Sequence, residues 1–196
     1  MNLPNRLTVL RIILSFVFMF LLFSKGLLVK ILALVAFSIA ALTDFYDGYI
    51  ARKYNLITDL GKLLDPIADK ILVLAAFLAF VEMRIIPAWM VVVIILRELI
   101  ITGIRFLAAN KGKILAAAKA GKHKTVSQMV SIFIILGFIV GRELCVEVFG
   151  GWDSSLEFWL EFGIYILMLI TVALTLISGV FYIKENKNIF KSAKIS

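Results

Sequence analysis

The sequence has few of the residue types that build disulfide frameworks and zinc sites. It contains one cysteine, Cys145, and one histidine, His123, among 196 residues. A single cysteine excludes an internal disulfide framework, and we interpret Cys145 as a small apolar filler. His123 stands among lysines, so we expect it to be solvated rather than to act as a catalytic base. Zinc draws mainly on cysteine and histidine ligands, so a zinc site is disfavoured.

Charged residues are also scarce. They make up 17% of the chain, whereas hydrophobic residues make up 62% and the mean hydropathy is +1.03. Soluble domains are about 45–50% apolar, so this composition predicts an integral membrane protein. No small-residue cleavage site follows the first apolar run, and we therefore expect no cleavable signal peptide. No internal repeat is evident, which disfavours a transporter built from duplicated halves.

Six apolar segments approach the length of about 20 residues that a helix needs to cross a bilayer. They cover residues 7–24, 29–52, 61–82, 87–109, 124–142 and 156–183. We expect an all-α, six-transmembrane-helix bundle with an N-terminal interfacial segment, forming a single domain over residues 1–196. Pro4 suits a helix start, and Arg6 and Arg11 are expected to extend toward lipid headgroups.

Lysine and arginine are distributed unevenly between the two ends of these segments. With the N-terminus in the cytoplasm, only four of the 21 fall on the outer side: Lys25, Lys30, Arg84 and Arg142. The positive-inside rule then predicts cytoplasmic termini, in a membrane that we expect to be a bacterial inner membrane. The outer loop between the last two segments is expected to be acidic, with Glu143, Glu147, Asp153 and Glu157.

Four aspartates lie between Thr43 and Lys70, at the inner ends of the second and third segments. Asp44 and Asp47 are three positions apart, and Asp65 and Asp69 are four apart. On helices, both spacings place the members of a pair on one face. Clustered carboxylates at membrane depth repel one another unless a cation lies among them. Oxygen ligands favour Mg²⁺ or Mn²⁺, and four carboxylates suffice for two ions, an arrangement that assists displacement at phosphorus.

The fourth segment carries charges at membrane depth, where they face the protein interior or a water-filled cavity. Arg97 and Arg105 can each clamp phosphate oxygens through two donors, and Lys122 and Lys124 can add point charges. Two interpretations of Glu98 remain open, a structural pair with either arginine or a part in the site. The lysine-rich loop near residues 111–124 suits either lipid headgroups or phosphate. Metals and phosphate ligands at one end of a membrane bundle indicate phosphoryl-group transfer involving a lipid.

The aspartate pattern resembles the signature of a known family. Asp44-x₂-Asp47-Gly48-x₂-Ala51-Arg52-x₈-Gly61-x₃-Asp65-x₃-Asp69 is similar, without departure, to that of the CDP-alcohol phosphotransferases. Further motifs resemble the family members whose acceptor is sn-glycerol 3-phosphate. These motifs are Pro4-Asn5-x-Leu7-Thr8-x₂-Arg11, Arg97-Glu98, Arg105 and Gly121-Lys122-x-Lys124-Thr125.

The resemblance covers essentially the whole chain and implies a specific reaction. The phosphatidyl group of CDP-diacylglycerol would pass to sn-glycerol 3-phosphate, with release of CMP. Two divalent ions, Mg²⁺ or Mn²⁺, would be held by Asp44, Asp47, Asp65 and Asp69, and Asp69 would also deprotonate the attacking hydroxyl. The lipid nucleotide would contact Asn5, Thr8, Gly48, Ala51, Arg52 and Gly61. The glycerol phosphate would contact Arg97, Arg105, Lys122 and Lys124.

The resemblance also bears on partners and on rival functions. Family members are commonly homodimers embedded in membrane lipid, and we expect no nucleic-acid partner. Other acceptors used in the family are phosphatidylglycerol (giving cardiolipin), serine and inositol phosphate, and the surplus of basic residues disfavours serine. The rivals outside the family are a cation channel or transporter and a structural scaffold. The first would place arginines beside a cation path, and the second would leave four buried acids without a role.

Overall fold

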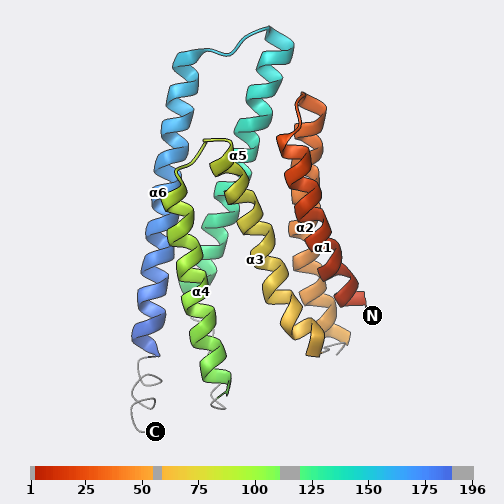
Figure 1. Cartoon of the computed structure of the whole chain (residues 1–196), viewed down its shortest axis with the longest axis vertical. Helices are drawn as coiled ribbons and strands as arrows, with labels where there is room; N and C mark the ends of the chain where they lie inside the picture. Colours follow the sequence, from red (N-terminus) through yellow and green to blue (C-terminus); the bar gives the residue numbers. More distant parts are fainter. Residues whose placement is uncertain (1–2, 55–58, 111–119, 187–196) are drawn as a thin grey trace. The chain divides into compact units, whose positions relative to one another are not determined.

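The computed structural model describes residues 3–54, 59–110 and 120–186, and every secondary-structure element in these ranges is an α-helix. The helices are α1 (Leu3–Phe23), α2 (Leu27–Tyr54), α3 (Asp59–Glu82), α4 (Ala88–Asn110), α5 (Ala120–Phe149) and α6 (Ser154–Glu185) (Figure 1). The all-α prediction is confirmed. Within these helices, the side chains of residues 3–6, 44–54, 59–66, 69, 107, 109–110 and 120–123 are outside the description.

The helices follow the six predicted segments closely, with two differences. Because α1 runs unbroken from Leu3, the expected N-terminal segment forms the first turns of α1 rather than a separate element. The expectation of an acidic outer loop is wrong for Glu143 and Glu147, because α5 continues past residue 142 to Phe149 and carries both residues. Of the four predicted loop acids, Asp153 alone lies between the two helices, since Glu157 belongs to α6.

The chain divides into two compact units. The first contains Met1–Ile85 and Ile132–Glu161, and the second contains Ile86–Ser131 and Phe162–Ser196. The boundaries between the units fall within α5 and α6, so both helices contribute to both units. A single domain over the whole chain stays a prediction.

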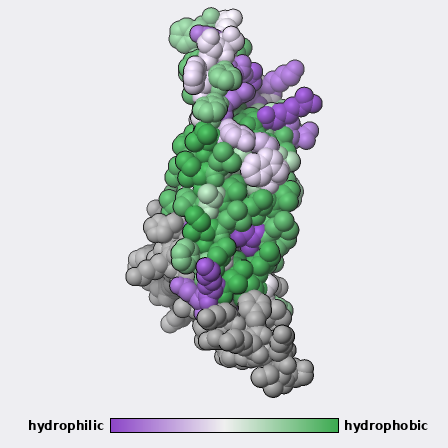
Figure 2. All heavy atoms as spheres, turned by 90° about the vertical axis from the view of Figure 1, so that its left-hand side faces the viewer, coloured by the Kyte–Doolittle hydropathy of each residue, from purple (hydrophilic) through white to green (hydrophobic). Residues whose placement is uncertain are grey.

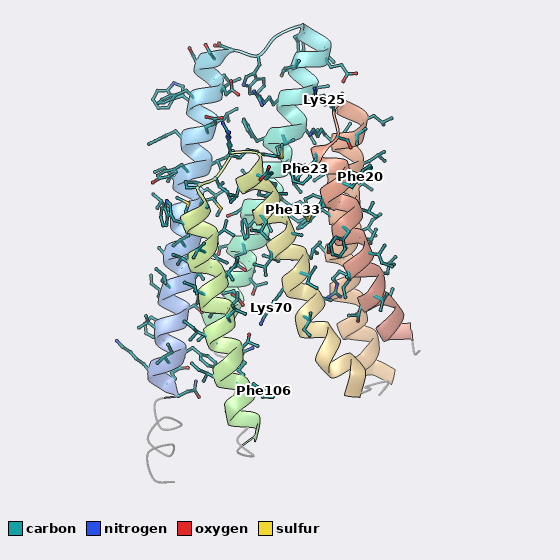
Figure 3. The ribbon with its side chains drawn as sticks, in the orientation of Figure 1. Phe20, Phe23, Lys25, Lys70, Phe106 and Phe133 are labelled. Atoms are coloured by element: carbon teal, nitrogen blue, oxygen red, sulfur yellow. The ribbon has the colours of Figure 1, made fainter. Side chains whose placement is uncertain are left out.

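In the first unit, α1 packs against both α2 and α3. Phe37 of α2 is fully buried, and its ring centroid lies 5.3 Å from that of Phe18 on α1 and 5.4 Å from that of Phe133 on α5. Phe133 is labelled in Figure 3. Buried alanines of α2 line one stripe, at Ala33, Ala36 and Ala40. Small residues in a stripe let helix backbones approach closely, which suits helices that associate in lipid.

The turn between α1 and α2 is held by side chains at both helix ends. Glu143 and Glu147, one turn apart on α5, accept hydrogen bonds from the amides of Gly26 at 3.0 Å and Leu27 at 3.1 Å. The buried ammonium of Lys30 donates to the carbonyl of Leu22, in the last turn of α1. Helix ends leave amides and carbonyls unpaired, and acids suit the N-terminus whereas cations suit the C-terminus. Each helix end at this turn therefore has a partner of the favourable sign.

The end of α3 has a backbone conformation that favours glycine. The amide of Ile85 donates to the carbonyl of Phe80, and that of Arg84 donates to Val81, both at 2.9 Å. This is the hydrogen-bond pattern of a Schellman helix stop, which needs a left-handed residue just past the helix. Arg84 is that residue, with φ of 59°.

The surfaces of the longest helices are apolar. Lys124–Phe149 and Ser154–Glu185 are long and apolar enough to cross a membrane, with mean hydropathies of 2.1 and 2.5, and shorter apolar helices cover Leu7–Phe23 and Leu27–Thr43. Burial inside the protein accounts for only 28% and 39% of the two long spans, unlike a core helix of a soluble protein. Figure 2 shows apolar side chains over most of the described surface on the α6 side. The chain is a membrane protein with apolar helical spans.

Candidate active site

The four aspartates lie on two helices that are joined through residues 55–58. Asp44 and Asp47 belong to the C-terminal half of α2, and Asp65 and Asp69 to the N-terminal half of α3. At 1.5 Å per residue, Asp44 and Asp69 are each about 15 Å along their helix from the joined end, and Asp47 and Asp65 about 10 Å and 9 Å. The helical spacing on which the prediction depends is confirmed, and the two pairs lie at similar distances from the joined ends of their helices. Their carboxylates are outside the described side chains, so their roles stay predictions.

Pro66 lies in α3 between Asp65 and Asp69 and leaves one helical hydrogen bond of α3 unmade. A helix that began near Gly61, where the third predicted segment starts, would place Pro66 in its first turns, where a missing amide is tolerated. The helix begins earlier, at Asp59, so Pro66 lies in its interior. A proline there cannot donate to the carbonyl four residues before it, which is that of Lys62. The helix nevertheless continues to Glu82.

The buried face of α1 is polar toward its N-terminus. Thr8 and Arg11 are 0% exposed, and Ser15, one turn further, donates to the Arg11 carbonyl at 2.8 Å. We expected Arg11 to extend toward headgroups, and its complete burial shows that this expectation is wrong. Measured from the α1–α2 turn, Thr8 is about 23 Å along α1 and Asp44 about 26 Å along α2. The polar part of α1 therefore lies near the level of the acids, in the helix that packs against both of theirs.

The other residues expected around the lipid nucleotide are placed only as helical positions. Asn5 lies in the first turns of α1; Gly48, Ala51 and Arg52 follow Asp47 on α2; and Gly61 precedes Asp65 on α3. Their side chains are outside the description, as is that of Lys122 on α5. In Figure 3, the labelled Lys70 marks the level on α3 next to Asp69.

In the second unit, a buried network joins Arg97, Glu98 and Lys124. The Glu98 carboxylate accepts a hydrogen bond from Arg97 at 3.2 Å, and the same oxygen is paired with the ammonium of Lys124. All three side chains are largely buried, with 9% of Arg97, 16% of Glu98 and 9% of Lys124 exposed. The other terminal nitrogen of Arg97 donates to the hydroxyl of Ser178 at 2.9 Å. The network thus ties α4 to α5 and α6.

Arg105 has a different environment, two turns further along α4. Its Nε donates to the hydroxyl of Tyr182 at 3.3 Å, and its guanidinium carbon lies 5.2 Å from the centre of the Tyr182 ring. Tyr182 is held in a cluster with the buried Ile101 and Ile104. Among the residues that the structure describes, the two terminal nitrogens of Arg105 have no hydrogen-bond partner. Phe106, labelled in Figure 3, marks this level of α4.

These contacts distinguish two arginines that the sequence grouped together. Arg97 is buried and directs both terminal nitrogens at protein oxygens, whereas Arg105 is exposed and, among the described residues, donates a hydrogen bond through Nε alone. The open question about Glu98 is resolved in part, because it pairs with Arg97 and Lys124 rather than with Arg105. Arg97, Glu98, Arg105 and Lys124 together carry a charge of +2, which suits a phosphate dianion.

The residues that the sequence analysis missed lie on α6. Ser178 and Tyr182 are one turn apart and belong to a buried polar stripe with Thr171 and Thr175. The signal was present as hydroxyl-bearing residues recurring every three or four positions within an otherwise apolar segment.

Comparison with known proteins identifies the family that the aspartate signature resembles, over nearly the whole chain. Residues 1–183 match the model of the CDP-alcohol phosphatidyltransferase family. A protein of Bacillus subtilis named CDP-diacylglycerol–glycerol-3-phosphate 3-phosphatidyltransferase is 37% identical, over 98% of both chains. A protein of Rickettsia bellii with the same name is 36% identical, over 96% of this chain and 97% of its own. The chain therefore belongs to the CDP-alcohol phosphatidyltransferase family.

Proposed function

We propose that this protein transfers the phosphatidyl group of CDP-diacylglycerol to sn-glycerol 3-phosphate, giving phosphatidylglycerophosphate and CMP. The observation that carries the proposal is the similarity over nearly the full chain to relatives named for this reaction. The charges of the second unit support the choice of acceptor. An exposed arginine beside a network of net charge +1 suits an acceptor with a phosphate group better than serine or an uncharged alcohol.

In the proposed reaction, a hydroxyl oxygen of glycerol 3-phosphate attacks the phosphorus of the phosphatidyl group. The new P–O bond forms as the bond to the bridging oxygen of CMP breaks, and the hydroxyl proton passes to the carboxylate of Asp69. Glycerol 3-phosphate thereby gains the phosphatidyl group, and CMP leaves with the bridging oxygen. The lipid nucleotide is held by Asn5, Thr8, Gly48, Ala51, Arg52 and Gly61.

Divalent metal ions fit the residues of the first unit. Asp44, Asp47, Asp65 and Asp69 supply only carboxylate oxygens, the ligands that Mg²⁺ and Mn²⁺ prefer. We assign two ions to these four residues. When bound, such ions neutralise the negative charge on the diphosphate and on the departing CMP.

The acceptor phosphate is assigned to Arg105, with Lys122 and Lys124 adding charge. The free edge of the Arg105 guanidinium carries two parallel donors, which match two oxygens of one phosphate. Arg97 is assigned a supporting role, because its terminal nitrogens already have protein partners. Two observations fit a division into metal and phosphate regions, namely the acids on α2 and α3 and the cations on α4 and α5.

The proposal includes the arrangement in the membrane. Six spans, cytoplasmic termini and a cytoplasmic active site would give both water-soluble components, glycerol 3-phosphate and CMP, direct access. The uneven distribution of lysine and arginine supports this orientation. A homodimer is proposed from the family resemblance alone.

A CMP-release assay tests the proposed acceptor. The purified protein is incubated with CDP-diacylglycerol and Mg²⁺, and candidate acceptors are added singly. We expect release of CMP with glycerol 3-phosphate, and none above background with serine, inositol phosphate or phosphatidylglycerol. Release with phosphatidylglycerol alone would instead indicate a cardiolipin synthase of this family. No release with any alcohol would contradict the proposed function itself.

A further inference from the structure

The side chain of Arg97 lies directly against the backbone of α6. One terminal nitrogen of Arg97 donates to the hydroxyl of Ser178 at 2.9 Å, and the residue that follows Ser178 on α6 is Gly179. A Cβ atom added to Gly179 would lie 3.1 Å from Cγ and 3.5 Å from Nε of Arg97. The first separation is shorter than ordinary van der Waals contact, so a larger residue at this position would displace the arginine. Ser178 and Gly179 therefore both determine the position of the Arg97 side chain. Ser178 does so through a hydrogen bond, and Gly179 does so because it has no side chain to displace the arginine.

The position of Arg97 determines how Glu98 is shared. One carboxylate oxygen of Glu98 serves both Arg97 and Lys124. If Arg97 moved away, the Glu98 carboxylate would no longer be shared between two cations of this network, and its charge would act on Lys124 alone. An ammonium held in a closed pair with a carboxylate has less capacity to attract a phosphate. Keeping Arg97 in place thus preserves the net positive charge around Lys124.

We propose that Ser178 and Gly179 are positioning residues for the acceptor phosphate, acting through Arg97 and Glu98 on Lys124. This inference rests on the proposed function, in which Lys124 and Arg105 bind the phosphate of glycerol 3-phosphate. Neither residue of α6 touches the substrate in this assignment. Both are buried, and Ser178 is 4% exposed. Their effect is therefore on affinity for the acceptor rather than on the lipid nucleotide.

The test compares hydroxyl removal at two positions of α6. Ser178→Ala removes the bond to Arg97, and Ser178→Thr retains a hydroxyl. Thr171→Ala is the matched control, because Thr171 is buried on the same helix and bonds to Ser131 at 2.8 Å, outside the Arg97 network. Ser131 keeps its bond to the Ser127 carbonyl in that variant. Each variant is assayed for KM with both substrates, and its thermal unfolding is measured.

We expect Ser178→Ala to raise KM for glycerol 3-phosphate about 5–10-fold, the effect of weakening one hydrogen bond to a charged group. KM for CDP-diacylglycerol should stay within about twofold, and Ser178→Thr should restore most of the lost affinity. Gly179→Ala should act in the same direction as Ser178→Ala. Thr171→Ala should leave both KM values near wild type.

Two results would overturn the inference. One is a Ser178→Ala variant with the kinetics of Thr171→Ala, and the other is an equal change in both KM values. If Ser178→Ala fails to fold, Gly179→Ala decides the matter by the same criteria. Lys124→Ala and Arg105→Ala separate this inference from the proposed function. If both leave KM for glycerol 3-phosphate unchanged, the phosphate site itself is wrong; if both raise it and Ser178→Ala does not, the positioning role alone fails.

Discussion

Tyr182 contacts Arg105 in two ways at once, through its hydroxyl at 3.3 Å and through the face of its ring at 5.2 Å. The ring is itself fixed by Ile101 and Ile104. A guanidinium that is held by two contacts loses less freedom when it binds a phosphate than one that is free to rotate. The apolar packing of α4 on α6 is thereby linked to the affinity of a cation for its ligand.

Tyr182→Phe and Tyr182→Leu separate these two contacts. Tyr182→Phe removes the hydrogen bond and keeps the ring, so we expect KM for glycerol 3-phosphate to rise about 2–5-fold. Tyr182→Leu removes the cation–π contact as well and should raise it further. Tyr165→Phe is the matched control, being an exposed tyrosine on the same helix. Unchanged acceptor kinetics in both Tyr182 variants would contradict the proposed role of Arg105.

Asp69→Asn tests the assignment of the base. An amide cannot accept the hydroxyl proton, so we expect kcat to fall at least about 100-fold, whereas binding of CDP-diacylglycerol is largely preserved. Binding is measured with a labelled lipid nucleotide and turnover by CMP release. Asp153→Asn makes the same change at an exposed acid before α6, where Asp153 caps the amide of Ser155 at 2.9 Å. Wild-type turnover by the Asp69 variant would refute the assignment.

Removal of divalent ions should abolish transfer. Four carboxylates without a cation repel one another, so we expect that chelation with EDTA stops CMP release and weakens CDP-diacylglycerol binding. Dialysis followed by addition of Mg²⁺ or Mn²⁺ should restore both. Full activity after exhaustive chelation would show that the four aspartates do not serve a metal-dependent reaction.

Arg84→Gly should stabilise the protein, because it relieves a left-handed backbone at the end of α3. Glycine adopts this conformation without the steric cost of a Cβ atom, a gain of about 1 kcal/mol. For a chain of this size, that corresponds to a rise in Tm of about 2–4 °C. Arg84→Ala is the control, since it removes the charge and keeps the Cβ atom. An equal rise in both variants would attribute the gain to charge instead.

Glu143→Ala should lower stability without altering substrate affinity. Glu143 accepts the Gly26 amide at the start of α2, and loss of such a cap costs about 0.5–2 kcal/mol. Glu161→Ala serves as the control, because Glu161 is exposed on α6. Thermal unfolding and both KM values are measured in each variant. A selective effect on KM for glycerol 3-phosphate would contradict a purely structural role.

The sequence was sufficient to predict the helices and the helical spacing of the acids. Long apolar runs predict the number and bounds of the helices closely, because a membrane leaves few alternatives to a helix. The aspartate spacing depends only on helical periodicity, which the helix bounds of α2 and α3 confirm. The expected preference for Mg²⁺ or Mn²⁺ rests on residue type alone and stays a prediction.

Contacts between helices that are distant in the chain could not be predicted from the sequence. Nothing in the pattern around Arg11 distinguishes a buried guanidinium from one extended to headgroups, since both have the same sequence neighbours. Similarly, the proposed roles of Ser178 and Tyr182 depend on their hydrogen bonds from Arg97 and Arg105, which lie some 80 positions earlier in the chain. Likewise, Glu143 and Glu147 of α5 accept hydrogen bonds from amides of the α1–α2 turn, some 120 positions earlier. Such pairings require the packing of whole helices, which no local pattern encodes.

The α1–α2 turn has a consequence for the surrounding lipid. Glu143 meets this turn at the level of Gly26, and α5 continues about 9 Å further, at 1.5 Å per residue, before it ends at Phe149. Within the first unit, α5 therefore extends beyond the turn that joins α1 to α2. A bilayer matches the apolar length of the helices beside it, by thinning or thickening locally. We expect thinner lipid beside α1 and α2 than beside the end of α5 at Phe149.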